Sequence, residues 1–349
     1  MKTIGLIFGG TSSEHRISLW TGRFIFETLN NLNLKVIPIL YTRNGKWVYA
    51  NHPVNHMPGN NESTPDELEN LFMNHFTPPM DSFPFNLKFD VCFLGLHGGS
   101  GENGVIQGFL DLQKIPYTGS GVLASALAMD KYISYQLFEK HNFNVSPFFE
   151  ISKNDYIVNR NILKEKLIDF PYFLKPTCGG SSVSTGMVKN IGEADELIKK
   201  IFIKEERALF QKPIRGVEVS CGVLEKSTSS GIICRALNPT EIVPDGDFFD
   251  ESAKYQGKSK EITPARISNE LRITIQELSI KAHKILGCSG YSRTDFIIEN
   301  NIPFILETNT LPGMTPNSLI PQQVRYEGED MKDVLLNLIE IAEKRNQAM

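Results

Sequence analysis

The chain has 349 residues, more than one typical domain holds, so two or three domains are expected. Its apolar fraction of 41% suffices for buried cores, and its formal net charge of −4 gives no electrostatic reason to expect nucleic acid as a partner. The five cysteines stand singly without a CxxC pair, so their spacing indicates neither a zinc site nor a disulfide framework and favours a reduced, cytoplasmic protein.

The N-terminal part predicts an α/β domain with a parallel sheet. A buried strand at Thr3–Phe8 leads through a glycine- and serine-rich loop into a helix over about 17–29, and a second strand follows at Lys35–Tyr41. The first apolar run is too short for a signal peptide or a membrane span, and no later run is long enough, so we expect no membrane association.

A third strand, at Asp90–Leu96, ends in His97-Gly98-Gly99. Ligands of α/β sheets bind at the carboxyl ends of the strands. We therefore expect the two glycine-rich loops, at 9–13 and 97–104, to face one crevice.

Helical and strand patterns alternate through the rest of the chain. The expected elements are helices at Leu123–Asn142, Ser268–Leu286 and Asp330–Lys344, and strands at Tyr172–Lys175, Val217–Leu224 and Gly231–Arg235, the last two antiparallel. Gly287 is the predicted stop of the second helix. Residues 237–266 show neither period, and so long a stretch without regular structure is typical of disorder or of a functional lid.

The segment Ser292–Asn309, SRTDFIIENNIPFILETN, predicts a hairpin that turns at about Asn300-Asn301. Pairing Ile297 with Ile305 fixes its register. That register places Asp295 opposite Glu307 and Arg293 opposite Asn309 on one face, and Phe296, Ile298, Phe304 and Leu306 on the other. Two carboxylates and an amide oxygen, without His or Cys, suit Mg²⁺ that bridges to nucleotide phosphates. A solvated polar face with an Arg–Asp ion pair is the alternative interpretation.

A glycine- and serine-rich turn, Gly179-Gly180-Ser181-Ser182, follows the strand that ends near Lys175. Its closely spaced backbone N–H groups suit phosphate oxygens, and Lys175 can add a point charge, although a flexible turn has the same composition. The GxxxxGK[ST] spacing of a P-loop is absent, and so is GxGxxG, which disfavours a nicotinamide dehydrogenase.

The turn Leu311-Pro312-Gly313-Met314-Thr315 follows the hairpin directly. The Gly313 N–H and the Arg293 side chain together predict a pair that stabilises an oxyanion. A plain Pro-Gly turn is the alternative interpretation.

Six sequence segments carry a family resemblance. They are FGGTSSEH, HGGSGENGVIQGFLDLQKIPYTGSGVLASALAMDK, KPTCGGSSV, AKY, RTDF and ETNTLPGMTPNSLIP, and they span about residues 4 to 321. In this order they resemble the motif set of the D-alanine–D-alanine ligase family of the ATP-grasp superfamily. The resemblance implies an ATP-grasp fold, with an N-terminal parallel-sheet α/β domain at 1–122 followed by two α+β domains, 123–212 and 213–349, that sandwich ATP and carry a lid at about 237–266.

The resemblance also implies residue roles. The magnesium ligands are Asp295, Glu307 and Asn309, for two ions that Mn²⁺ can replace. The ATP-binding residues are Lys131, Lys175, Ser181, Gln211, Glu218 and Lys254. The substrate-binding residues are Glu14, His97, Ser318 and Leu319, and the catalytic residues are Glu14, Ser181, Tyr255, Arg293 and Gly313. Glu14, Ser181 and Tyr255 are expected to be hydrogen-bonded across the domains.

Four positions depart from the usual family pattern. Arg16 stands where an acid is common, and Asn103 replaces an Asp. Gln211 takes the place of an acid near the adenine amino group, where its amide oxygen can still accept, and Glu251 replaces an aromatic in the lid. None is a metal ligand or a phosphate lysine, so they bear on adenine affinity and substrate preference.

The implied activity is an ATP-dependent ligation for peptidoglycan precursor synthesis. The carboxylate of one D-alanine attacks the γ-phosphorus of ATP, and the amine of a second D-alanine attacks the resulting acyl-phosphate. D-Alanine and ATP are the expected partners, and family members are commonly homodimers. Tyr255 is neutral beside the incoming amine and favours D-alanine, while D-lactate and D-serine stay open as second substrates. A non-catalytic regulator descended from this fold is disfavoured, because Arg293, Asp295, Glu307 and Asn309 are all intact.

Overall fold

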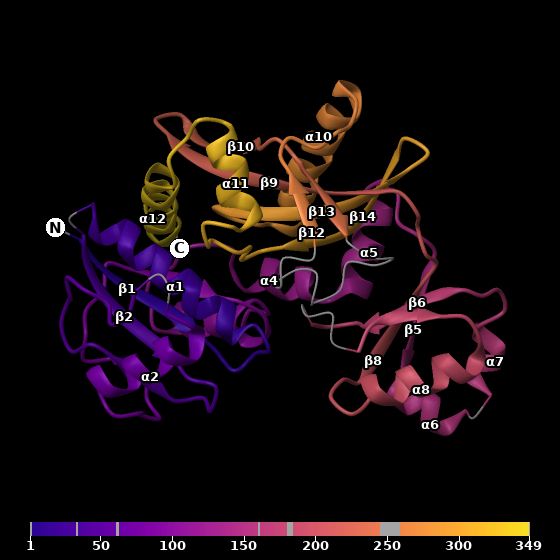
Figure 1. The fold of residues 1–349 in the computed structure, drawn as a ribbon, viewed down its shortest axis with the longest axis horizontal. Helices are drawn as coiled ribbons and strands as arrows, with labels where there is room; N and C mark the ends of the chain where they lie inside the picture. Colours follow the sequence, from indigo (N-terminus) through magenta and orange to yellow (C-terminus); the bar gives the residue numbers. More distant parts are fainter. Residues whose placement is uncertain are drawn as a thin grey trace.

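The computed structural model describes residues 2–32, 34–60, 63–159, 161–179, 184–244 and 259–348. Its described strands form three sheets, which Figure 1 shows as an N-terminal unit, a large C-terminal sheet and a smaller sheet at the far end from the N-terminus. None of the described helices combines the length and the apolar character needed to cross a bilayer.

The N-terminal sheet has the strand order β3-β2-β1-β4. Strand β1 (Thr3–Gly9) pairs in parallel with β2 (Lys35–Tyr41) and with β4 (Val91–Leu96), while β3 (Trp47–Tyr49) is antiparallel at the edge. These apolar runs are buried almost throughout, as expected for a covered parallel sheet. The helices of this unit are α1 (His15–Asn30), α2 (Pro65–His75) and α3 (Val105–Leu112). The predicted parallel sheet is confirmed.

The smaller sheet is antiparallel and has the order β5-β8-β6-β7. Its strands are β5 (Phe148–Ser152), β6 (Tyr172–Pro176), β7 (Gly186–Val188) and β8 (Arg207–Gln211). The helices α6 (Lys153–Val158), α7 (Ile162–Lys166) and α8 (Ile191–Ile201) accompany it. Side chains of these elements form a separate apolar core, so this sheet is stabilised independently of the N-terminal unit.

The single helix predicted over Leu123–Asn142 is wrong. The structure has two helices, α4 (Val122–Met129) and α5 (Lys131–Lys140), which meet at Asp130. Asp130 has an extended backbone with φ −86° and ψ 97°, and its carboxylate caps α5 by accepting the Ile133 N–H at 3.0 Å. An aspartate that caps the next helix ends the preceding one, even where the apolar periodicity continues.

The C-terminal sheet has the order β12-β11-β9-β13-β14, with β10 on β9. Its strands are β9 (Val217–Thr228), β10 (Gly231–Ala236), β11 (Thr240–Pro244), β12 (Ser259–Ile262), β13 (Tyr291–Glu299) and β14 (Ile302–Asn309). Helices α4, α5 and α10 (Asn269–Leu286) share an apolar core with β9 and β13. Helices α11 (Leu319–Tyr326) and α12 (Met331–Ala348) contribute instead to the core shared with the N-terminal unit, and α12 lies beside that unit in Figure 1.

The predicted ends of α10 are confirmed. Ser268 caps the helix by accepting the Leu271 N–H at 3.2 Å, and Gly287 ends it in the left-handed region with φ 73°.

The prediction of an irregular stretch over 237–266 is wrong at both ends. Strands β11 and β12 pair with each other in antiparallel register, and β11 also pairs with β9. Both strands are short, TEIVP and SKEI, and mix polar with apolar residues. A period of two cannot be recognised over so few residues. Residues 245–258 lie outside the described part of the chain.

The β13–β14 hairpin has one register irregularity. Arg293 pairs with Asn309 and Asp295 with Glu307, as predicted, but the register shifts between Asp295 and Phe296. Beyond this β-bulge, Ile297 pairs with Phe304, so the predicted pairing of Ile297 with Ile305 is wrong. Ile305 pairs with Phe296 and is buried beside it, whereas Phe304 and Leu306 are half-buried. The bulge therefore buries Ile305 in place of Phe304 and Leu306, whereas Asp295 and Glu307 remain opposite each other.

Candidate active site

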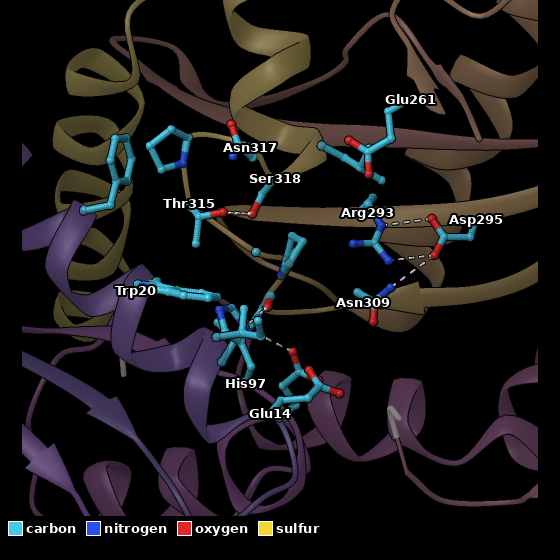
Figure 2. Close-up of a pocket in the computed structure, with 18 of the residues that line it drawn as sticks. Glu14, Trp20, His97, Glu261, Arg293, Asp295, Asn309, Thr315, Asn317 and Ser318 are labelled. Carbon is cyan, nitrogen blue, oxygen red and sulfur yellow. Dashed lines mark hydrogen bonds and ion pairs between the residues drawn. The ribbon is translucent and has the colours of Figure 1, made fainter. Parts of the chain in front are cut away.

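A cavity of about 650 Å³ lies between the N-terminal unit and the C-terminal sheet. Figure 2 shows Glu14, Trp20 and His97 on one side of it and the hairpin residues Arg293, Asp295 and Asn309 on the other. The predicted residues that line it are Glu14, His97, Arg293, Asp295, Glu307, Asn309, Gly313, Ser318 and Leu319. Residues from Glu14 to Leu319 are thus brought to one cavity. Of the two glycine-rich loops expected to face one crevice, 97–104 lines the cavity through His97 and Glu102, whereas 9–13 does not line it but contacts the other loop, where Ser12 donates to the His97 carbonyl at 2.6 Å.

The hairpin contributes a connected polar face. Arg293 donates to both oxygens of Asp295, from Nε at 2.9 Å and from Nη2 at 2.7 Å. Ser220 on the neighbouring β9 donates to the same carboxylate, and Asn309 donates to it through Nδ2 at 3.4 Å. Asp295 is 6% exposed, so its buried carboxylate is satisfied by donors from three neighbouring side chains.

The donor chemistry of this face fits a magnesium ion. Asp295 and Glu307 are opposite each other across the strand pair, and the amide of Asn309 adds a neutral oxygen. An oxygen-only set with two carboxylates is what a hard divalent cation requires. The Nδ2 of Asn309 points at Asp295, which directs its amide oxygen elsewhere.

Two buried lysines approach the hairpin from other elements. Lys131, at the start of α5, places Nζ 3.7 Å from a carboxylate oxygen of Glu307 and also donates to the Gly179 carbonyl. Lys175, at the end of β6, donates to the Tyr135 hydroxyl at 2.9 Å. Both lysines are less than 10% exposed, so their charges act in a medium of low dielectric constant.

Tyr135 connects three parts of the molecule. Its hydroxyl on α5 accepts from Lys175 on β6 and donates to the Leu306 carbonyl on β14 at 2.7 Å. Burial, and next the negative charge of Glu307, raise the pKa of this phenol above its usual value. Tyr135 therefore keeps its proton and acts as a neutral bridge between lysine and hairpin.

Gln211, at the end of β8, carries a buried amide with an unsatisfied group. Among the described residues its Nε2 has no hydrogen-bond partner, and its Oε1 lies 3.4 Å from the Tyr135 hydroxyl. An orphaned donor in the interior is costly unless a ligand satisfies it, so this position fits a ligand that offers a hydrogen-bond acceptor. In this orientation Gln211 presents the donor Nε2, whereas the sequence predicted that its amide oxygen accepts from the adenine amino group. Rotation of the amide by about 180° exchanges Nε2 and Oε1.

His97 is held by hydrogen bonds on both ring nitrogens. Its Nδ1 lies 3.0 Å from the Leu311 carbonyl, which can only accept, so Nδ1 carries the proton. In the neutral ring, Nε2 then accepts from Thr21 Oγ1 at 2.8 Å. His97 thus joins the N-terminal unit to the loop after β14, and Glu102 lies 3.9 Å from it.

The loop after β14 brings Gly313 close to Ser318. A Cβ at position 313 would lie 2.7 Å from Ser318 Oγ, so a larger residue here would require the Ser318 side chain to shift. Ser318 Oγ accepts the Thr315 N–H at 3.1 Å and lies 2.7 Å from Thr315 Oγ1. Ser318 stands at the N-cap of α11 without capping it through its side chain, which leaves a helix N-terminus directed at the cavity that Leu319 also lines.

Some predicted residues are not placed in the cavity. Ser181, Lys254 and Tyr255, and the departure at Glu251, lie outside the described residues. Glu218 lies on β9 opposite Ile242 and Ile297 and does not line the cavity.

Two of the departures have structural roles. Arg16 forms an exposed ion pair with Asp66 at 3.1 Å. The side chain of Asn103 accepts the Val105 N–H at 3.1 Å at the start of α3.

Sequence reasoning missed several lining residues, among them Trp20, Glu102 and Glu261. Glu102 follows the glycines after β4, so its loop position could have suggested it. Glu261 sits on the short strand β12, where burial raises the pKa of its carboxyl, opposed by hydrogen bonding from Gln322 and by the charge of Arg293. No local pattern indicated Glu261, because its place depends on the pairing of β12 with β11.

Two antiparallel sheets that present lysines and carboxylates to one another define the ATP-grasp class of carboxylate–amine ligases, and this chain has that fold. The family models described as D-ala D-ala ligase N-terminus and C-terminus match residues 3–120 and 137–340. The chain belongs to the D-alanine–D-alanine ligase family.

Individual relatives agree over the full length. The chain is 49% identical to the D-alanine–D-alanine ligase of Leptospira interrogans serovar copenhageni, covering 99% of both chains. It superposes on the VanG D-Ala:D-Ser ligase from Enterococcus faecalis with a TM-score of 0.82 at 31% identity, covering 98% of this chain and 99% of that one. The D-alanine–D-alanine ligase from Bacillus anthracis complexed with ATP gives a TM-score of 0.74 at 25% identity, covering 100% and 99%.

Proposed function

We propose that this chain condenses two molecules of D-alanine into D-alanyl-D-alanine, converting ATP to ADP and phosphate, as a step of peptidoglycan precursor synthesis. The observation that carries the proposal is the cavity in which Glu14 and His97 of the N-terminal unit meet Arg293 and the paired carboxylates of the hairpin. The Leptospira relative at 49% identity is named for this reaction, which favours D-alanine over the D-serine named for the 31% identical structure.

The phosphates of ATP are proposed to lie between the two antiparallel sheets. Lys131 and Lys175 would neutralise them, and Gln211 would contact the adenine. Ser181, Glu218 and Lys254 are proposed as further ATP-binding residues on the family resemblance. Asp295, Glu307 and Asn309 would hold two Mg²⁺ or Mn²⁺ ions, which supply charge neutralisation at the phosphates.

The chemistry is proposed to run in two displacements. A carboxylate oxygen of the first D-alanine attacks the γ-phosphorus and forms an acyl-phosphate, and ADP leaves. The amine of the second D-alanine attacks the acyl carbon, phosphate leaves, and a proton is lost from nitrogen. Arg293 and the Gly313 N–H are proposed to stabilise the tetrahedral oxyanion. The bidentate contact with Asp295 fixes the guanidinium plane of Arg293 for that task.

The substrates are proposed to occupy opposite ends of the cavity. Glu14 and His97 would hold the first D-alanine, and Ser318 with the Leu319 backbone at the start of α11 would hold the carboxylate of the second. Tyr255 is proposed to join Glu14 and Ser181 when the site closes, and a lid within about 237–266 would exclude water from the acyl-phosphate.

We further propose three domains, with limits at 1–122, 123–212 and 213–349. We also propose that the protein is a homodimer, is located in the cytoplasm and does not associate with membranes. They rest on the family resemblance and on the sequence composition.

The test is a coupled assay of the purified chain with ATP, Mg²⁺ and single substrates. D-Alanine should give ADP, phosphate and the dipeptide in equal amounts, and D-alanine mixed with D-serine or D-lactate should give mainly the D-alanine product near pH 7. Release of phosphate without dipeptide, or a mixed product as the main species, would overturn the proposal.

A further inference from the structure

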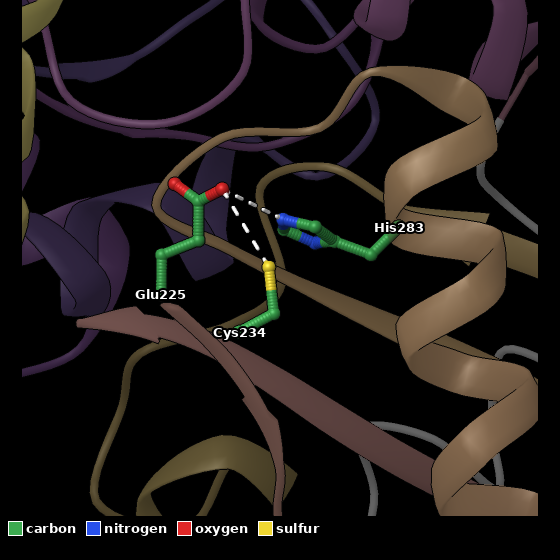
Figure 3. Close-up of side chains that lie close together, drawn as sticks. All are labelled: Glu225, Cys234 and His283. Atoms are coloured by element: carbon green, nitrogen blue, oxygen red, sulfur yellow. Dashed lines mark hydrogen bonds and ion pairs between the residues drawn. The ribbon is translucent and has the colours of Figure 1, made fainter. Parts of the chain in front are cut away.

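Three potential metal ligands gather on the face of the C-terminal sheet opposite the cavity. Glu225 on β9 pairs directly with Cys234 on β10, so their side chains share a face, and His283 of α10 lies over them (Figure 3). Gly222 of β9 pairs with Arg293, whose side chain lines the cavity. Because side chains alternate along a strand, Glu225 projects to the other face, where α10 packs.

The spacing of the three ligand atoms matches one small cation. His283 Nε2 lies 3.4 Å from Glu225 Oε1, Cys234 Sγ lies 3.9 Å from the same oxygen, and all three atoms lie within 4.8 Å of one another. A tetrahedral zinc ion with bonds of about 2.0–2.3 Å separates its ligand atoms by roughly 3.3–3.7 Å. The two separations from Glu225 Oε1 are close to this range, and side-chain movement on binding would bring Cys234 Sγ and His283 Nε2, which lie within 4.8 Å, to three of the four positions.

Neighbouring groups already orient two of these ligands. The other oxygen of Glu225 accepts the Gly290 N–H at 2.6 Å and lies 3.4 Å from Ser289 Oγ, so Oε1 is the oxygen that faces the cluster. The other nitrogen of His283 lies 2.7 Å from the Ser292 hydroxyl. Metal-binding histidines in proteins are held in this way through the second ring nitrogen.

We propose that Glu225, Cys234 and His283 form a site for a borderline-soft divalent cation such as Zn²⁺, with water as the fourth ligand. The nitrogen, sulfur and oxygen donors select Zn²⁺ or Co²⁺ over Mg²⁺, in contrast to the oxygen-only hairpin. His283 is buried, whereas Glu225 and Cys234 are half-buried, so the ligands are fixed and solvent can reach them. The bound ion would join the β9–β10 hairpin to α10.

Uptake of the cation requires the loss of a proton. Burial, and next the charge of Glu225, raise the pKa of the Cys234 thiol, while Lys284 lowers it. Binding as the thiolate would release the thiol proton.

The test is a titration of the full chain with Co²⁺ in excess Mg²⁺. Wild type should show one intense near-ultraviolet thiolate-to-cobalt band at one equivalent, and Cys234→Ser should lose it. Cys178→Ser removes the other cysteine that is not fully buried and should keep the band. Absence of the band in wild type, or the same band in Cys234→Ser, would overturn the proposal, because cobalt at the oxygen ligands of the hairpin gives no thiolate band.

A thermal measurement gives a second, independent readout. Zn²⁺ should raise the Tm of wild type and of Cys178→Ser but not that of Cys234→Ser, since only a site in the folded state stabilises it. Glu225→Gln keeps an oxygen for Gly290 but removes the charge, and should weaken Co²⁺ binding by about tenfold or more. Equal Zn²⁺ stabilisation of wild type and Cys234→Ser would contradict the site.

Discussion

Asp295 lies directly opposite Glu307 across β13 and β14, although the register of the two strands shifts at the very next residue of β13. The β-bulge changes which apolar side chains of β14 are buried, but it leaves the two carboxylates opposite each other. Lys131 approaches Glu307 and Arg293 holds Asp295, so each carboxylate has its own cation. This pairing is the basis of the proposed metal and phosphate site.

Glu307→Gln should reduce kcat by about a hundredfold or more, ~2.7 kcal/mol in the barrier. The amide keeps the shape of the side chain but removes the negative charge that would bind the metal. Steady-state phosphate release at saturating Mg²⁺ measures the effect. Glu299→Gln on the same hairpin, whose carboxylate accepts the Arg215 N–H instead, is the control and should stay near wild type. More than about a tenth of wild-type activity in Glu307→Gln, ~1.4 kcal/mol, rules out the assignment.

Gly313→Ala should raise the KM for the second D-alanine. The added Cβ would sit 2.7 Å from Ser318 Oγ and force the Ser318 side chain to shift at the start of α11, where the second carboxylate is proposed to bind. Gly108→Ala is the control, because its Cβ would meet only an ordinary 3.5 Å contact with Val122. Initial rates as a function of D-alanine give both constants. An unchanged KM in Gly313→Ala would argue against a substrate site at this helix end.

Tyr135→Phe should weaken both stability and ATP binding. It removes the hydroxyl that accepts from Lys175 and donates to the Leu306 carbonyl, a loss of about 1–3 kcal/mol. Thermal unfolding with and without ATP measures both effects. Tyr172→Phe, on the same strand as Lys175, is the matched control. If Tyr135→Phe and Tyr172→Phe change the Tm and the rise of Tm on adding ATP equally, the bridge has no special role.

The Glu241–Arg266 pair should make stability depend on pH in acid. Hydrogen bonding from Arg266 lowers the pKa of Glu241 below its usual 4.5, so the pair stabilises the fold above the unfolded pKa and its contribution is lost as the pH falls through the folded pKa. Arg266→Gln should therefore lower the free energy of unfolding at pH 7 and make it fall less steeply below pH 4.5. Arg272→Gln, on the surface of α10, should keep the wild-type slope. Denaturant unfolding at pH 7 and below pH 4.5 measures the free energy of unfolding of each variant. If this free energy falls equally with pH in wild type and in Arg266→Gln, the pair does not have this role.

Local sequence patterns predicted those structural features that depend on a single segment of the chain. The buried runs of β1, β2 and β4 predicted a parallel sheet, and Ser268 with Gly287 predicted both ends of α10. The residues of the hairpin face were also predicted, because the Asp295–Glu307 pairing precedes the bulge.

Non-local contacts explain what could not be predicted. The alternating residues after Asp295 fit either register equally well, so the bulge left no mark in the sequence. The approach of Lys175 to Leu306 through Tyr135 depends on how two sheets dock, and Glu261 depends on a partner strand. The Glu225, Cys234 and His283 cluster contains a single cysteine, and its histidine comes from a helix remote in sequence, so short cysteine motifs indicated no zinc site.

The central claim is that a D-alanine carboxylate takes the γ-phosphoryl group of ATP before the peptide bond forms. D-Alanine carrying ¹⁸O in both carboxylate oxygens tests it, with mass spectrometry of the phosphate and the dipeptide after turnover in unlabelled water. The account predicts one ¹⁸O atom in each phosphate released, because the attacking oxygen departs with phosphorus when the second amine displaces it. Unlabelled phosphate alongside labelled dipeptide would contradict an acyl-phosphate intermediate and with it the proposed mechanism.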